Sequence, residues 1–338
     1  MQQPYFLNEA GNKKMKDGIM LWYAGKNPFI KSISGTDVTV HSTYNGEPVT
    51  QNYPSLNNAA IALQADPNTE VYIEGTITNI NNQSSETRIV CHSTALTNLS
   101  YYNCPALTSL DLSANTALTN ISCSSCPALT SLDLSANTAL TSLSCSSCPA
   151  LTSLDLSANT ALTSLNCYSC PALTSLDLSA NTALTSLDCH SCYALTLLDL
   201  SANTALTSLS CYDCYGLTSL DLSANTALTS LSCYSCPALT SLDLSANTAL
   251  TSLNCYSCPA LTSLDLSANT ALTSLNCDHC NYIETIKYVA QNTGVATKIA
   301  GLISEAFATD GNVYCKGTYS STVQTAATSK GWTYHTLE

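Results

Sequence analysis

The sequence predicts a solenoid of stacked 22-residue coils, with a parallel β-sheet along one face, between a small N-terminal α/β or β-rich module and a C-terminal α/β cap. Three observations predict this fold. Over residues 105–280 a 22-residue unit, LTSLDLSANTALTSLxCxxC plus two linking residues, is written eight times. Each unit consists of two related halves of 11 residues with the frame LxxLx(L/C)xx(N/C)xx, and a regular period in the 20s is typical of solenoids. All lysines and arginines lie outside the repeats.

These observations divide the chain into three expected domains. Residues 1–88 form a module for attachment or capping, residues 89–282 hold about eight and a half coils, and residues 283–338 form a cap. The first coil is imperfect, because Tyr101 stands where later coils have the first cysteine. Caps are expected because a terminal coil would otherwise expose its apolar face.

Local patterns predict the elements of the two flanking domains. In the N-terminal module, residues 37–41 and 69–80 alternate like strands, residues 45–48 form a turn, and residues 55–64 suit a short helix with Ser55 as its N-cap. In the cap, the predicted elements are helices over residues 283–290, 297–307 and 320–330 and a strand over residues 312–315.

The nineteen cysteines comprise eight CxxC pairs and three further residues, Cys91, Cys104 and Cys315. Within the repeat frame, the first cysteine of each pair replaces the third leucine and the second replaces the asparagine. Both thiols are therefore predicted to lie in the core, in two columns with a spacing of about 4.8 Å between coils. The residues of this structural core ladder are Cys123, Cys126, Cys145, Cys148, Cys167, Cys170, Cys189, Cys192, Cys211, Cys214, Cys233, Cys236, Cys255, Cys258, Cys277 and Cys280.

The expected role of this ladder is packing by buried, reduced thiols, which behave as small apolar groups. Tetrathiolate metal sites built from adjacent pairs and disulfides between coils are the alternatives, although an odd number of cysteines leaves one thiol unpaired in a monomer. Catalytic thiols are not expected, because burial in apolar surroundings raises the pKa of a thiol. No metal and no cofactor is predicted.

The frame LxxLxLxxN is the signature of leucine-rich repeats. LTSLDLSANTALTSLxC resembles the short leucine-rich repeats of internalin-type and gut Bacteroidetes surface proteins, including those with a cysteine ladder in the core. The resemblance covers residues 96–282. It implies a right-handed solenoid with a parallel sheet on its concave face and a role in adhesion or ligand binding. The chain departs from this family in two respects: the asparagine of one half is itself cysteine, and the usual secretion signal is not evident.

The positions at which the repeats differ mark the candidate binding surface, which we call the stripe. It consists of the outward residue between the two thiols of each coil and the outward residue two positions earlier. Tyrosine supplies rigid contact area, and serine and asparagine supply adaptable hydrogen bonds, as on many ligand-binding surfaces. An aromatic column that only strengthens cross-strand packing is the alternative. The candidate ligand-binding residues are Tyr102, Tyr168, His190, Tyr212, Tyr234, Tyr256, Asp278, Asn166, Asp188 and Asn254.

A second exposed column consists of one aspartate per coil. Carboxylates about 4.8 Å apart in water repel each other by about 0.9 kcal/mol, and physiological salt reduces this further, so no counterion is required. Diffuse condensation of cations is expected here rather than defined Ca²⁺ sites, which need six to eight oxygen ligands. The column consists of Asp111, Asp133, Asp155, Asp177, Asp199, Asp221, Asp243 and Asp265.

Charge excludes several classes of partner. Of the net charge of −13, almost all belongs to the repeats, since residues 91–286 carry twelve acids and no base. Such a surface cannot neutralise phosphates, so nucleic acid and anionic membranes are poor partners. No apolar run reaches the about 18 residues of a membrane span, and the apolar patch at residues 19–24 lacks the length and cleavage pattern of a signal peptide.

Three hypotheses for function remain, and none of them is an enzyme, because no nucleophile, base and orienting group recur at a workable spacing. The leading hypothesis is an adhesion or ligand-binding protein that presents the stripe to a protein or glycan. The second is a structural component of a virion or surface appendage, such as a phage tail fibre or decoration protein, whose N-terminal module docks to a larger assembly. The third is a thiolate–metal array. The first two predict an extracellular location, as a virion or bacterial surface component.

Overall fold

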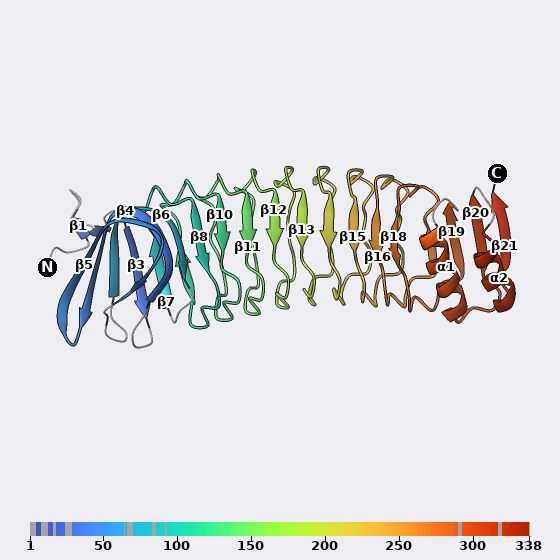
Figure 1. The fold of residues 1–338 in the computed structure, drawn as a ribbon, viewed down its shortest axis with the longest axis horizontal. Coiled ribbons are helices and arrows are strands. Elements are labelled where there is room, and N and C mark those ends of the chain that lie inside the picture. Colours follow the sequence, from blue (N-terminus) through green and yellow to red (C-terminus); the bar gives the residue numbers. More distant parts are fainter. Residues whose placement is uncertain are drawn as a thin grey trace. The chain divides into compact units, whose positions relative to one another are not determined.

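The structure, a computed structural model, describes residues 5–7, 13–15, 18–23, 29–63, 65, 70–82, 86–91, 93–289, 293–316 and 320–337. The chain divides into two compact units, Met1–Cys170 and Pro171–Glu338. The repeats form a β-solenoid of 22-residue turns, with an antiparallel β module at the N-terminal end of the chain and an α/β cap at the C-terminal end (Figure 1). The predicted fold class is confirmed.

The first unit begins with the antiparallel β module. β3 pairs with β6 and β7, β4 pairs with β5 and β6, and β1 and β2 form a separate pair. Its core consists of fully buried aliphatic side chains such as Ile19, Leu21, Val40 and Ile73. Its strands are β1 (Tyr5–Leu7), β2 (Lys13–Met15), β3 (Gly18–Tyr23), β4 (Phe29–Tyr44), β5 (Glu47–Ala62), β6 (Glu70–Asn82) and β7 (Glu86–Cys91).

The helix predicted over residues 55–64 is wrong. Ser55 lies inside β5 and pairs with Thr36 of β4, in an antiparallel ladder that covers both strands. Pairing along this length outweighs the weak helix preference of an alanine-containing segment, since propensity is readily overridden by tertiary context. The turn predicted at residues 45–48 is confirmed: Asn45 and Gly46, with φ of 52° and 76°, make the two-residue connection typical of tight hairpins. Gln64 and Thr69, at the ends of two expected elements, lie outside the described residues.

The coils of the first unit continue directly from this module. β8, β10, β11 and β12 are parallel and in register, so that Ile121 lies beside Leu143. β6 pairs in parallel with β8, and β7 with β9, so the module supplies the strands on which the first coil stacks. The coil strands are β8 (Asn98–Tyr101), β9 (Ser109–Asp111), β10 (Asn120–Ser122), β11 (Ser142–Ser144) and β12 (Ser164–Asn166).

The second unit continues the same pattern. β13, β14, β15, β16 and β18 pair in parallel with an offset of 22 residues, as Leu209 with Leu231. The leucines, both cysteines and the asparagine of each coil point inward and are buried, as the repeat frame predicts. The strands are β13 (Ser186–Asp188), β14 (Ser208–Ser210), β15 (Ser230–Ser232), β16 (Ser252–Asn254), β17 (Ser263–Asp265) and β18 (Ser274–Asn276).

The C-terminal cap is a parallel sheet with two helices. Its strands, β19 (Thr285–Val289), β20 (Asn312–Lys316) and β21 (Thr333–Leu337), extend from β17 of the last coils. The helices are α1 (Thr293–Glu305) and α2 (Ser321–Lys330). Ser320 caps the start of α2, and Gly331 ends it with φ of 84°.

The helix predicted over residues 283–290 is wrong, because this segment forms β19. Its side chains alternate between half-buried and buried, and Ile286 pairs with Leu264 of the last coils. The exposed edge of β17 offers unpaired backbone groups, and a short Ile- and Val-containing segment satisfies them as a strand. Ala290 lies outside the described residues. The other predicted elements of the cap are confirmed.

Candidate functional site

Each coil places a stripe residue immediately after its strand. β14 ends just before Cys211, and Tyr212 follows between the two thiols. The next residue, Asp213, has φ of 54°, so the turn passes through a left-handed conformation. The Asp213 N–H donates to the Tyr234 carbonyl at 3.0 Å, which holds successive turns in register. The residue between the thiols therefore stacks on its equivalent in the next coil.

This register builds an aromatic stack in the second unit. The rings of His190 and Tyr212 lie 4.0 Å apart, and those of Tyr212 and Tyr234 lie 4.1 Å apart, both nearly parallel. All three side chains are half-buried. Burial and the neighbouring Tyr234 hydroxyl raise the pKa of Tyr212 above its ordinary value. The Asp188 Oδ1 lies 2.6 Å from His190 Nδ1, so two of the predicted site residues orient each other.

The other aromatic and acidic residues of the stripe differ in exposure and in their partners. Tyr102 is 50% exposed and Tyr256 is 36% exposed, and Tyr256 meets the ring of His279 edge-on. Tyr168 of the first unit is half-buried. Asp278 forms a 2.9 Å ion pair with Lys298 of α1, which connects the last coil to the cap.

The polar residues of the stripe bond mainly to the backbone of their own turn. Asn166, Asp188 and Asn254 accept the N–H of the residue two positions further along, which stabilises the bend before the second thiol. Ser124 and Ser146, expected to be exposed, are 7% and 3% exposed because their hydroxyls bond to each other. The stripe is therefore less continuous on the surface than the sequence predicts.

The thiols form the ordered core ladder that the sequence predicts. All nineteen cysteines are buried and free. The second thiol of a pair donates to the carbonyl of the first cysteine one coil earlier, as Cys148 does to Cys123 at 3.2 Å and Cys258 to Cys233 at 3.2 Å. A thiol that donates its proton to a carbonyl must be protonated, which favours the reduced, packing role.

Burial disfavours the thiolate form of several of these thiols. It raises the pKa of Cys123 and Cys211 well above the ordinary value and that of Cys236 to about 12. A nucleophile or metal ligand requires the thiolate, which is disfavoured here. Among the described residues, no three or more His, Cys, Asp or Glu side chains are grouped to hold a metal ion.

Three exposed apolar or aromatic side chains were missed by the sequence analysis. Tyr193 and Tyr215 follow the second cysteine of their coils, where most coils have proline, and they stack at 4.9 Å while remaining 46% and 50% exposed. Leu197 replaces a serine of the repeat and is 66% exposed. The signal was present in the sequence, because all three residues depart from the repeat within two adjacent coils.

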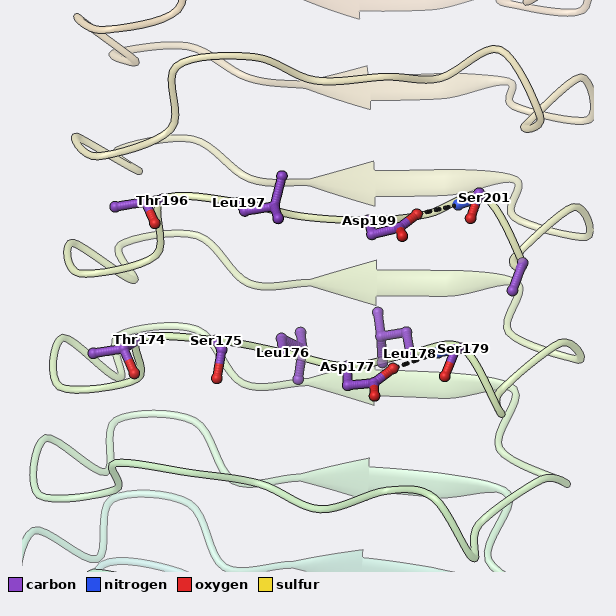
Figure 2. Close-up of a pocket in the computed structure, with 11 residues that line it drawn as sticks. Thr174, Ser175, Leu176, Asp177, Leu178, Ser179, Thr196, Leu197, Asp199 and Ser201 are labelled. Carbon is purple, nitrogen blue, oxygen red and sulfur yellow. Dashed lines mark hydrogen bonds between the residues drawn. The ribbon is translucent and has the colours of Figure 1, made fainter.

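A groove of about 610 Å³ lies beside Leu197 on the face that carries the aspartates. Figure 2 shows Leu197 in the position that Ser175 holds in the preceding coil, on the segment that carries Asp199 and next to the segment that carries Asp177. Each of these aspartates accepts a hydrogen bond at 2.9 Å from the backbone N–H of the serine two positions further along. The groove therefore combines an exposed leucine with two oriented carboxylates.

Comparison with known proteins relates two of the coils to a family. Residues 105–148 match the family described as Leucine Rich repeats (2 copies). The coils are similar to leucine-rich repeats. Among solved structures, the chain is similar to the functional domain of InlJ from Listeria monocytogenes, described as including a cysteine ladder, with 27% identity over 72% of this chain and 75% of that chain and a TM-score of 0.33. It is also similar to the internalin InlF from Listeria monocytogenes, with 18% identity over 78% and 89% and a TM-score of 0.42. The comparison with curated proteins found no match.

The described part of the chain contains no helix that is both long and apolar enough to cross a bilayer. Its two helices, α1 and α2, belong to the cap.

The aspartate column gives a prediction about acid stability. Hydrogen bonds from the backbone N–H and hydroxyl of Ser201 lower the pKa of Asp199, and Ser135 does the same for Asp133. A carboxyl whose pKa is lowered on folding stabilises the fold above the unfolded pKa of about 3.9, and this contribution is lost as the pH falls through the folded pKa. We expect the carboxyl carbons of Asp133 and Asp199 to titrate below pH 3.9 in an NMR titration of the folded protein. Midpoints at or above 3.9 would show that repulsion between neighbouring carboxylates outweighs the hydrogen bonds.

Proposed function

We propose that this chain is a non-enzymatic adhesion or ligand-binding protein that acts outside the cell, on a bacterial surface or after secretion. Leucine-rich repeat folds of this type are generally non-enzymatic and typically bind proteins. The observation that carries the proposal is the concentration of exposed Tyr193, Leu197 and Tyr215 in two adjacent coils of an otherwise uniform array. Surfaces that bind partners place aromatic and aliphatic anchors in this way.

The proposed binding surface combines these three residues with the stack of His190, Tyr212 and Tyr234. Tyrosine contributes rigid contact area with a polar tip, and the exposed leucine favours a protein over a glycan as the partner, because a saccharide offers no large apolar group to cover it. The remaining stripe residues of the second unit, including Tyr256, are proposed contacts of the same partner. The alternative of a virion or appendage component, docked through the N-terminal module, stays a prediction.

The repeats themselves supply the variants that test this surface. Tyr193→Pro, Leu197→Ser and Tyr215→Pro restore the residues that most coils use, so we expect the triple variant to fold with an unchanged melting temperature. Binding to an immobilised array of purified extracellular protein domains should weaken at least 10-fold. If no domain binds, or if the triple variant binds as well as the parent chain, the proposal fails.

The stack is tested separately with Tyr212→Ala plus Tyr234→Ala. We expect weaker binding to the same domain and a stability loss of a few kcal/mol, because a stacked aromatic pair contributes about 0.5–1.5 kcal/mol beyond its buried area. A variant that loses stability but binds normally would assign the stack to packing alone. Melting curves and binding isotherms recorded on the same preparation separate these outcomes.

A further inference from the structure

The first unit carries a second groove, of about 310 Å³, which we call the amide groove. It lies where the N-terminal module meets the first coils. Its volume is at the lower end of the ~300–1,000 Å³ range of small-ligand sites. The residues that line it are Asn58, Asn79, Asn81, Asn98, Leu99, Ser100, Asn120, Ile121, Ser122, Ser142 and Ser144.

Strand register arranges the polar residues of this groove in two rows. Asn79 of β6 lies beside Asn98 of β8, which lies beside Asn120 of β10. The second row contains Asn81 beside Ser100, followed by the serines of the next two coils. Neighbouring strands are about 4.8 Å apart, so the first row is a line of three consecutive amide side chains.

Local contacts restrain two of these amides. The Asn98 Nδ2 donates one proton to the Thr97 hydroxyl at 3.0 Å. The Thr119 hydroxyl lies 2.8 Å from the Asn120 Oδ1 and 3.1 Å from the Thr97 carbonyl oxygen. Each amide has two N–H donors and one carbonyl acceptor, so the row offers donors and acceptors side by side, and a saccharide hydroxyl can bond to both.

The repeats show that asparagine is not needed here for the fold. At the positions equivalent to Asn98 and Asn120, the following coils have serine, as in Ser142, Ser164 and Ser208, and form the same parallel strands. Asparagine occurs only in the two coils that adjoin Asn79, where it completes a continuous amide row. Asparagine therefore replaces serine at the groove, although the strands of the coils do not require it.

The chemistry of the lining selects the ligand. None of the lining side chains is ionisable, and a charged ligand would leave its charge unpaired there. The apolar members, Leu99 and Ile121, are each only 2% exposed, so the groove offers no pocket for the apolar side chain of a peptide. Tyr102, 50% exposed and two residues beyond Ser100 in the same outward alternation, offers a ring against which the apolar face of a sugar can pack.

We propose that the amide groove is a binding site for a neutral oligosaccharide, held by Asn79, Asn98 and Asn120 through its hydroxyls. This site goes beyond the protein-binding surface proposed above and shares no residue with its three anchors or its aromatic stack. The two sites give the chain separate means of attachment to a protein and to a glycan. Loss of one proposal leaves the other intact.

The test uses the full chain and a panel of immobilised oligosaccharides: neutral oligomers of mannose, galactose, glucose and N-acetylglucosamine, with sialylated and sulfated oligomers alongside. We expect binding to at least one neutral oligomer. Asn98→Ser plus Asn120→Ser should weaken it at least 10-fold with an unchanged melting temperature, because both changes copy residues that later coils use. Tyr102→Ala should also weaken it.

Matched controls make each outcome decisive. Ser208→Ala plus Ser230→Ala alters the equivalent positions of the second unit and should leave glycan binding unchanged, as should Tyr193→Pro. The proposal is overturned if no neutral oligomer binds at millimolar concentration, if binding survives the double asparagine variant, or if only acidic oligomers bind. An extended-peptide array that is bound through Asn98 and Asn120, in the absence of sugar binding, would reassign the groove to peptides and would also overturn the proposal.

Discussion

Raising the pH from 7 to 10 in the presence of a reductant is expected to unfold this protein or to lower its melting temperature steeply. Burial raises the pKa of five thiols that do not share a proton with a neighbouring cysteine: Cys123, Cys148, Cys211, Cys236 and Cys277. In the unfolded chain these thiols ionise near pH 8.5. Above that pH the unfolded state releases protons that the folded state retains, so the free energy of the unfolded state falls relative to that of the fold.

The direction of this effect follows from linkage. A thiol whose pKa is raised on folding contributes its full stability below the unfolded pKa, and this contribution is lost as the pH rises toward the folded pKa. With an unfolded pKa of about 8.5, each thiol that stays protonated in the fold costs up to about 2 kcal/mol at pH 10. Five thiols together cost up to about 10 kcal/mol, comparable to the about 5–15 kcal/mol that stabilises an ordinary domain.

Circular dichroism melting curves from pH 7 to 10.5 measure the loss, and thiol titration in denaturant confirms that the cysteines are reduced at the start. Cys211→Val removes one titrating group at nearly constant volume, so its melting temperature should fall less between pH 7 and 10 than that of the parent chain. A melting temperature that stays constant up to pH 10 would show that the thiols are either oxidised or accessible to water.

The inward positions could be predicted from the sequence because the repeat determines them. Because the frame of 11 residues recurs many times, its leucines, cysteines and asparagines can be assigned to the core in only one way. The structure has all of these frame residues buried. The chemistry of the thiols followed from this assignment, because a buried thiol in apolar surroundings has a raised pKa.

Two helices were predicted incorrectly for a reason that lies outside their own segments. β5 and β19 form because another strand, β4 or β17, offers a row of backbone partners. Local spacing of apolar residues cannot reveal such a partner. The exposure of Tyr193, Tyr215 and Leu197 needed only a comparison of the coils, whereas the amide groove depends on the pairing of β6 with β8, which the sequence does not show.

The second cysteine and the asparagine of each coil both form hydrogen bonds to the preceding coil, but these hydrogen bonds differ in strength. Both side chains donate to carbonyls one coil earlier. The Asn225 Nδ2 donates to two of them, Leu200 at 3.1 Å and Asn203 at 2.9 Å, whereas the Cys236 thiol donates to one, Cys211 at 3.3 Å. An amide hydrogen bond is stronger than one from a thiol, which is a weak donor. The asparagine column is therefore expected to contribute more to the cohesion of the coils.

We expect Asn225→Ala to destabilise the second unit by about 2–3 kcal/mol. The Leu200 and Asn203 carbonyls keep their backbone N–H donors, but each loses its second hydrogen bond, at about 0.5–1.5 kcal/mol, and the shorter side chain leaves a cavity. Part of this loss is offset because the Asn225 Oδ1, which has no hydrogen-bond partner among the described residues, is removed as well. Asn225→Cys, which copies the other half of the coil, should lose less than Asn225→Ala because the thiol retains one donor. Cys236→Ala should cost about 1–2 kcal/mol, from one lost weak donor and a small cavity.

Hydrogen exchange of the backbone amides measures this order of effects better than a single unfolding midpoint, since a repeat array can open coil by coil. Protection should fall most in the coils on either side of residue 225 for the alanine variant, and less for the cysteine variant. If Cys236→Ala reduces protection as much as Asn225→Ala, the two columns contribute equally, and cohesion between coils comes from leucine packing and strand pairing instead of the side-chain donors.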